Sequence, residues 1–238
     1  IAKKSSPSVP ANFSVTSLGG GTVSLNFFKD DSATEYEVVE VITDSTEERT
    51  VGKFLKNPIL IQGLNNNFPY FYKVRAINEF GSSEFTELLG ATPSPSNSKV
   101  LIVNGFDRIA GTSNSFDFIL EHGNAVYANG YSFDATSNEA IINENLNLSD
   151  YPIVDWILGE EGAATSAFDA NEKVLIQDYI LNGGRLFVSG SEIGYDLYEK
   201  GNNSDKLFYE NVLKAEYISD AAGGTSGAYS IEGVSNSL

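Results

Sequence analysis

The stretch RLFVSGSEIG, residues 185–194, decides the fold of the second half of this chain. A strand-like apolar run leads into two glycines, Gly190 and Gly194, which bracket Glu192. This G-x-E-x-G spacing is typical of the sharp strand-to-helix turn on which α/β hydrolytic folds present a nucleophile beside backbone N–H groups. The turn therefore predicts the architecture of a catalytic site, with a carboxylate where a serine or cysteine would act.

The pattern around this turn predicts a parallel α/β sheet. Apolar runs of the kind buried on both faces of a sheet occur at 99–104, 151–158 and 185–190. Helices are expected at 113–122, 137–146, 170–181 and 203–217. Asp169 is the expected cap of the third helix, which Gly183 and Gly184 end. Strands that alternate with helices favour a three-layer α/β fold.

The first two fifths of the chain follow a different pattern, with short strands and no helical periodicity. Alternating apolar residues occur at 13–18, 22–28, 35–42, 58–64 and 70–77. Clusters of Gly, Asn, Asp and Ser separate these runs. Short strands at this spacing predict an antiparallel sandwich.

One motif in this part carries a family resemblance. The residues from Leu64 to Gly81 fit L-x5-Y-x-Y-x-V-x-A-x-N-x2-G, which resembles the E to G strands of fibronectin type III domains. Tyr70 stands at the position of their corner tyrosine, and Phe27 replaces their usual core tryptophan. The resemblance implies an all-β sandwich that acts as a spacer or binding surface.

A multidomain chain follows from these two patterns, with its boundary in the Pro/Ser-rich run TPSPSNS. The expected parts are an N-terminal linker at 1–9, a fibronectin type III domain at 10–93, a linker at 94–98 and an α/β domain at 99–238. The last twenty residues are polar and rich in Gly and Ser, so the final strand and helix of the α/β domain are expected to be missing from this chain.

The second domain carries its own resemblance. FDRIAG, DYPIVDWILGEEG and FVSGSEIGYDL look like the glutamine-amidotransferase-like domain of secreted Bacteroidetes proteins labelled xanthan lyase or N-acetylmuramoyl-L-alanine amidase. The resemblance implies a flavodoxin-like three-layer fold beside a fibronectin type III module, and a secreted or cell-surface bacterial location. Class I glutamine amidotransferases carry a cysteine at the turn, so Glu192 excludes glutamine hydrolysis through a thioester.

The loops after the three predicted strands should meet at one crevice, because parallel sheets bind ligands outside the carboxyl ends of their strands. Glu192, Asp107 and Glu160 are the candidate catalytic acids. Acids at helix N-termini, which the macrodipole favours, explain these residues at least as well. The candidate substrate-binding residues are Arg108, Ser191, Asn104 and Tyr195. No cofactor is expected, although these carboxylates would suit a divalent cation such as calcium.

Other conspicuous side chains have structural interpretations. His122 is expected to end a helix and to interact with its C-terminal dipole. Trp156 lies in a predicted buried strand and is expected in the core. Tyrosines close to amide side chains would suit a sugar, and this set is Tyr127, Tyr131, Tyr195 and Tyr198 with Asn124 and Asn129.

Composition narrows the class of partner. Fifteen Lys and Arg against thirty-two Asp and Glu give a net charge of -17, which repels nucleic acid. The absence of cysteine excludes disulfides, thiolate metal sites and a cysteine nucleophile, and one histidine excludes a multi-histidine metal cluster. No apolar run reaches the length of a membrane span, so membrane insertion is not expected.

Three functions fit these observations. The favoured one is an extracellular accessory or binding region of a secreted bacterial protein that associates with glycan or peptidoglycan, with a degenerate amidotransferase-like site. The second is a hydrolase or lyase of polysaccharide or peptidoglycan, in which Glu192 is the acid/base, Asp107 or Glu160 its partner, and Arg108 holds an anionic group. The third is a structural component of a cell-surface assembly, bound to a protein partner.

Overall fold

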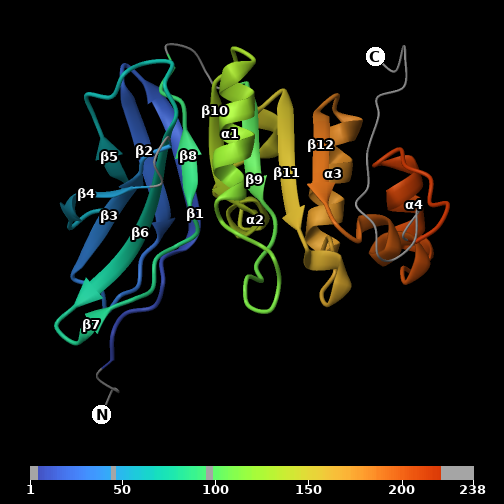
Figure 1. The fold of residues 1–238 in the computed structure, drawn as a ribbon, viewed down its shortest axis with the longest axis horizontal. Coiled ribbons are helices and arrows are strands. Elements are labelled where there is room, and N and C mark those ends of the chain that lie inside the picture. The colour runs from blue at the N-terminus through green and yellow to red at the C-terminus, as the bar shows by residue number, and fades with distance from the viewer. Residues whose placement is uncertain (1–4, 44–46, 95–98, 221–238) are drawn as a thin grey trace.

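The computed structural model of this chain describes residues 5–43, 47–94 and 99–220. This described part of the chain is β-rich and forms one sheet of seven strands and one of five, with few helices (Figure 1). Most of the expected linker at 94–98 and of the polar run at 219–238 lies outside the described residues. Within the described ranges, no helix is both long enough and apolar enough to cross a bilayer.

The N-terminal part is an antiparallel sandwich, as its alternating pattern predicts. One sheet contains β1 (Ala11–Gly19), β2 (Thr22–Phe28) and β5 (Ile59–Ile61). The other contains β3 (Glu35–Val41), β4 (Glu48–Phe54), β6 (Tyr70–Asn78), β7 (Gly81–Ser82) and β8 (Leu89–Ala91). The sequence patterns had not indicated β4, β7 and β8, because β4 has few apolar residues and the other two are very short.

Two residues of the sandwich take the positions that the fibronectin type III resemblance implies. The Tyr70 hydroxyl accepts a hydrogen bond from the backbone N–H of Asn65 at 3.0 Å, which is the geometry of a tyrosine corner. Phe27 is buried and its ring centroid lies 4.7 Å from that of Tyr36. The phenylalanine therefore retains an aromatic group in the core where the family usually has tryptophan.

The C-terminal part contributes four parallel strands in the order β10-β9-β11-β12. They are β9 (Val100–Asn104), β10 (Phe133–Ser137), β11 (Ile153–Gly159) and β12 (Arg185–Gly190). The sequence predicts β9, β11 and β12 but not β10, whose sequence FDATS lacks an apolar run. Asp134 is tolerated in this buried strand because the Tyr151 hydroxyl and the Ser17 N–H donate hydrogen bonds to its carboxylate.

Helices connect these strands and follow the last of them. They are α1 (Phe118–Ala128), α2 (Asn138–Ile142), α3 (Ala170–Leu181) and α4 (Asn203–Asn211). The predicted α3 is confirmed, and Asp169 and Glu172 form its capping box. The helix expected at 113–122 begins only at Phe118, because Ser113 and Asn114 bind the loop after β11 instead. The helices α2 and α4 end earlier than their sequence patterns predict.

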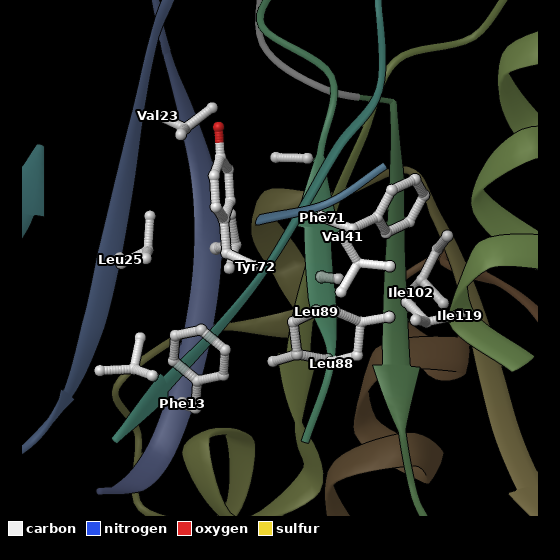
Figure 2. Packing of buried hydrophobic residues seen from close by; sticks show 14 of the residues in the cluster. Phe13, Val23, Leu25, Val41, Phe71, Tyr72, Leu88, Leu89, Ile102 and Ile119 are labelled. Atoms are coloured by element: carbon white, nitrogen blue, oxygen red, sulfur yellow. The ribbon is translucent and has the colours of Figure 1, made fainter. Parts of the chain in front are cut away.

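The two parts share one sheet and one core. Strand β10 pairs antiparallel with β1, with Ser14 opposite Thr136, so the sandwich sheet continues into the parallel strands. Figure 2 shows Phe71 of the sandwich strand β6 close to Ile102 of β9. Both side chains belong to one buried hydrophobic cluster. The change of pattern near residue 95 therefore marks a change of strand direction within a continuous sheet.

A second core lies under α3. Trp156 of β11 is fully buried there, as the sequence predicts, and its ring packs at 5.8 Å from that of Phe168. Phe208 of α4 packs against Phe168 in turn, with centroids 5.5 Å apart. Phe168 belongs to the segment between β11 and α3, so these contacts anchor that segment and connect α4 to β11 through it.

Candidate functional site

A crevice of about 640 Å³ opens at the carboxyl ends of β9, β10 and β11. The loop after β9 supplies Asp107 and Arg108, the start of α2 supplies Asn138 and Glu139, and the loop after β11 supplies Glu161. This is the edge at which parallel α/β sheets bind ligands. The sequence predicts the location of the crevice from the three strand ends, although not all of its residues.

Asp107 and Glu139 form an acid pair in this crevice. Asp107 as a residue is exposed, but partial enclosure of its carboxyl group is the largest of the effects that raise its pKa to about 6. The charge of Glu139 and a hydrogen bond with it raise the pKa further, followed by the charges of Glu161 and Asp169. Asp107 therefore gains a proton more readily than an isolated aspartate does.

A third carboxyl group approaches the pair from the sandwich. Glu87 accepts a hydrogen bond from the Asn104 side-chain amide at 2.5 Å, and its carboxyl group is enclosed although the residue as a whole is only partly buried. This burial, and then the charge of Glu139, raise the pKa of Glu87 to about 8. A groove of about 340 Å³ beside Glu87 shares Asp107 and Glu139 with the crevice, so the two hollows meet at this pair.

Two other acids of the crevice are bound to protein donors. Glu172 is almost fully buried, and its oxygens accept hydrogen bonds from the Asn138 amide at 2.9 Å and the Asp169 N–H at 2.7 Å. Burial is the main cause that raises the pKa of Glu172 to about 7. Glu161 accepts hydrogen bonds from the Arg108 N–H at 3.0 Å and from the Thr165 hydroxyl. These contacts shape the wall of the crevice.

Arg108 links the loops after β9 and β11. Its guanidinium Nη2 donates to the Glu160 carbonyl at 2.8 Å, and its Nε is buried without a partner among the described residues. The Asn114 side chain ties the same loops, because it donates to the Arg108 carbonyl at 2.8 Å and accepts from the Glu160 N–H at 2.7 Å. Arg108 thus lines a crevice whose loops are held in place before any ligand binds.

The structure places Glu160 away from the acid pair. Its carboxylate accepts a hydrogen bond from the Ser113 N–H at 2.8 Å, whereas the adjacent Glu161 lines the crevice. The sequence could not distinguish these neighbouring acids, because the short 3-10 helix η2 (Glu161–Ala163) begins between them and sets their directions.

Glu192 occupies the sharp turn that the sequence predicts. It follows β12 with a φ of 63°, in the left-handed region that side chains other than glycine rarely adopt. Its Cβ packs against Gly162, where a β-carbon would lie only 3.1 Å away. Glu192 is exposed, does not line the crevice, and is not among the charges that shift the pKa of Asp107. The structure therefore contains a strained turn at Glu192, but Glu192 does not reach the acid pair.

The other candidate binding residues have contacts of their own. Asn104 is buried and its amide binds Glu87. Ser191 donates its N–H to the Gly159 carbonyl at 2.7 Å, with its hydroxyl 3.4 Å from the same oxygen. Tyr195 begins the π-helical turn η3 (Tyr195–Glu199), and the Lys200 ammonium lies 5.9 Å from its ring centroid. None of these three lines the crevice.

His122 has a different role from the expected cap, and that expectation is wrong. The helix α1 runs on to Ala128, so His122 lies in its middle, and its Nδ1 lies 2.7 Å from the Asp155 carboxylate. Asp155 is largely buried in β11, with its other oxygen unpartnered among the described residues. A single acid within the apolar run YPIVDWIL was the signal that a partner had to exist.

No family model matches the chain, and no curated protein matches it significantly. Similar solved structures include fibronectin type III domains. The crystal structure of FN3tt is 24% identical with a TM-score of 0.36, over 39% of this chain and 100% of that one. The sixth domain of human fibronectin type III domain containing protein 3 is 20% identical with a TM-score of 0.33, over 40% and 93%. Because both TM-scores are below 0.5, the sandwich is assigned from the strand pairing of this chain and not from these similarities.

Proposed function

We propose that this chain is an accessory binding region of a secreted bacterial protein and that it holds glycan or peptidoglycan in the crevice. The observation that carries the proposal is the separation between the strained turn at Glu192 and the Asp107–Glu139 pair. The turn retains the shape of a nucleophile elbow, but the chain has no cysteine and its single histidine binds Asp155. These features support a degenerate amidotransferase-like site.

The strand order supports the flavodoxin-like part of the proposal. In chain order, β10-β9-β11-β12 are the second, first, third and fourth parallel strands. This matches the order of flavodoxin-like sheets, whose ligand binds where the order reverses between the first and third strands. The crevice lies at those strand ends and offers carboxylate, guanidinium, amide and hydroxyl groups. Such groups are suited to the hydroxyl and amide groups of a sugar chain.

The acid pair favours one alternative, a carboxylate-dependent hydrolase or lyase of the same polymers. A carboxyl group with a pKa of about 6 beside a second carboxylate is suited to general acid/base catalysis near neutral pH. In this alternative Asp107 and Glu139 carry the chemistry, and Arg108 holds an anionic group of the substrate.

The test compares the affinity of purified peptidoglycan fragments and a polysaccharide panel for the parent, the double variant D107N/E139Q and E192Q. We expect the double variant to lose binding at least tenfold and E192Q to bind like the parent, with no release of reducing ends or muropeptides. Turnover that E192Q abolishes would refute the degenerate site. Turnover that D107N/E139Q abolishes and E192Q retains would establish the alternative. Equal affinity for all three proteins, without turnover, would refute both.

A further inference from the structure

The opposite edge of the parallel strands carries another hollow. A pocket of about 430 Å³ opens where β9 and β10 begin, at the end of α1. Residues from the sandwich and from the α/β part line it together, and its principal side chains are Asn67, Thr92, Lys99, Tyr127, Tyr131 and Ser132. Because these are the amino ends of the strands, this pocket is separate from the crevice at their carboxyl ends.

Backbone hydrogen bonds hold the walls of this pocket. The Thr92 N–H donates to the Phe133 carbonyl at 2.8 Å, the Lys99 N–H donates to the Ser132 carbonyl at 3.2 Å, and the Asn67 N–H donates to the Pro93 carbonyl at 2.8 Å. The pocket is therefore formed before a ligand arrives, which reduces the ordering cost of binding.

Two exposed aromatic side chains flank the opening. Tyr127 is 39% exposed and Tyr131 is 49% exposed. The Phe68 ring meets the Tyr127 ring edge-on at 6.4 Å and the Tyr70 ring at 5.3 Å, so Tyr127 belongs to a packed aromatic group. A tyrosine held in this way offers an apolar ring face together with a polar hydroxyl, which suits a ligand that is itself part apolar and part polar.

We propose that this pocket binds one pyranose unit of a glycan, with the sugar ring against Tyr127 and Tyr131. The choice of a sugar rests on the proposed function, whereas the location rests on the pocket and the aromatic pair. A volume of about 430 Å³ falls within the range of roughly 300 to 1,000 Å³ found for small-ligand sites.

The test is an NMR titration of the ¹⁵N-labelled chain with chitotriose and with cellotriose, each to saturation. We expect shifts of the Gly130, Tyr131 and Ser132 amides with at least one sugar. Tyr131→Ala should weaken this binding at least tenfold, because the sugar ring loses one of its two aromatic faces.

Two controls separate this proposal from the crevice. Phe187→Ala removes an exposed aromatic side chain of β12, away from the pocket, and should bind both sugars like the parent. The D107N/E139Q variant should keep the shifts at 130–132 even if it loses binding in the crevice. The pocket proposal is overturned if no sugar shifts these amides, or if Tyr131→Ala binds as tightly as the parent. Shifts confined to the crevice would overturn it while leaving the proposed function intact.

Discussion

Replacement of Glu87 by Gln should make the protein more stable at pH 8 and leave it nearly unchanged at pH 5. Burial raises the pKa of the Glu87 carboxyl from 4.5 to about 8, so the folded state binds a proton that the unfolded state has released in this interval. Stability therefore falls as pH rises from about 4.5 to about 8. Gln mimics the protonated group and can still accept the hydrogen bond from Asn104.

The size of the effect follows from the interval between the two pKa values. One pKa unit corresponds to about 1.4 kcal/mol. Over most of the range between pH 5 and pH 8, the folded state binds close to one proton more at Glu87 than the unfolded state does. As pH rises through this range, the free energy of unfolding of the parent therefore falls by about 3 kcal/mol, a loss that the variant does not have. The neighbouring acids Asp107 and Glu172 also have raised pKa values, but they titrate in both proteins.

The assay is urea unfolding of both proteins at pH 5, 6, 7 and 8, followed by the fluorescence of Trp156, the single tryptophan of the chain. The difference in free energy of unfolding should grow with pH in favour of the variant. Glu84→Gln is the matched control, because Glu84 is an exposed acid in the same segment and should leave the pH profile unchanged. A constant difference between parent and E87Q over this range would refute the burial of an uncharged carboxyl group at position 87.

Three further predictions concern single side chains. Gly105→Ala should destabilise the chain by about 1 to 3 kcal/mol and alter its tryptophan fluorescence, since the new β-carbon would lie 2.0 Å from Trp156 Nε1; a neutral, spectrally silent variant would contradict this. Glu192→Gly should raise the free energy of unfolding by up to about 1 kcal/mol, because relief of the left-handed φ exceeds the entropy cost of glycine; a loss in thermal denaturation would argue against strain at the turn. His122→Ala should lower the free energy of unfolding by about 1 to 3 kcal/mol, because the Asp155 carboxylate loses its hydrogen bond. In a double-mutant cycle, H122A/D155A should lose less stability than the sum of the two single variants, and additive losses would contradict the pairing.

Much of the fold could be predicted from local sequence patterns. Strong apolar runs gave β9, β11 and β12, and the capping acid and paired glycines gave α3 with its correct bounds. Strand β10 could not be found in this way, because it lacks an apolar run and its buried Asp134 is satisfied by partners distant in the sequence, the Ser17 N–H and the Tyr151 hydroxyl. The pairing of β1 with β10, which joins the two parts, likewise could not be predicted from patterns of neighbouring residues.

The candidate site was only partly predictable. The strand ends predicted where the crevice lies and included Asp107 and Arg108, and the glycine spacing predicted the turn at Glu192. The partner acids Glu87 and Glu139 were missed, because one belongs to the sandwich and the other follows the unpredicted β10. Their approach to Asp107 depends on the shared sheet, so no spacing along the chain could reveal it.

The central claim is that ligand binds at the Asp107–Glu139 pair and not at the Glu192 turn. Amide shifts of the labelled chain during titration with a soluble muropeptide test this most directly. The account predicts that the largest shifts fall on residues 105–110 and 138–139, which border the crevice. Shifts centred on residues 190–196, with those two segments unmoved, would contradict it.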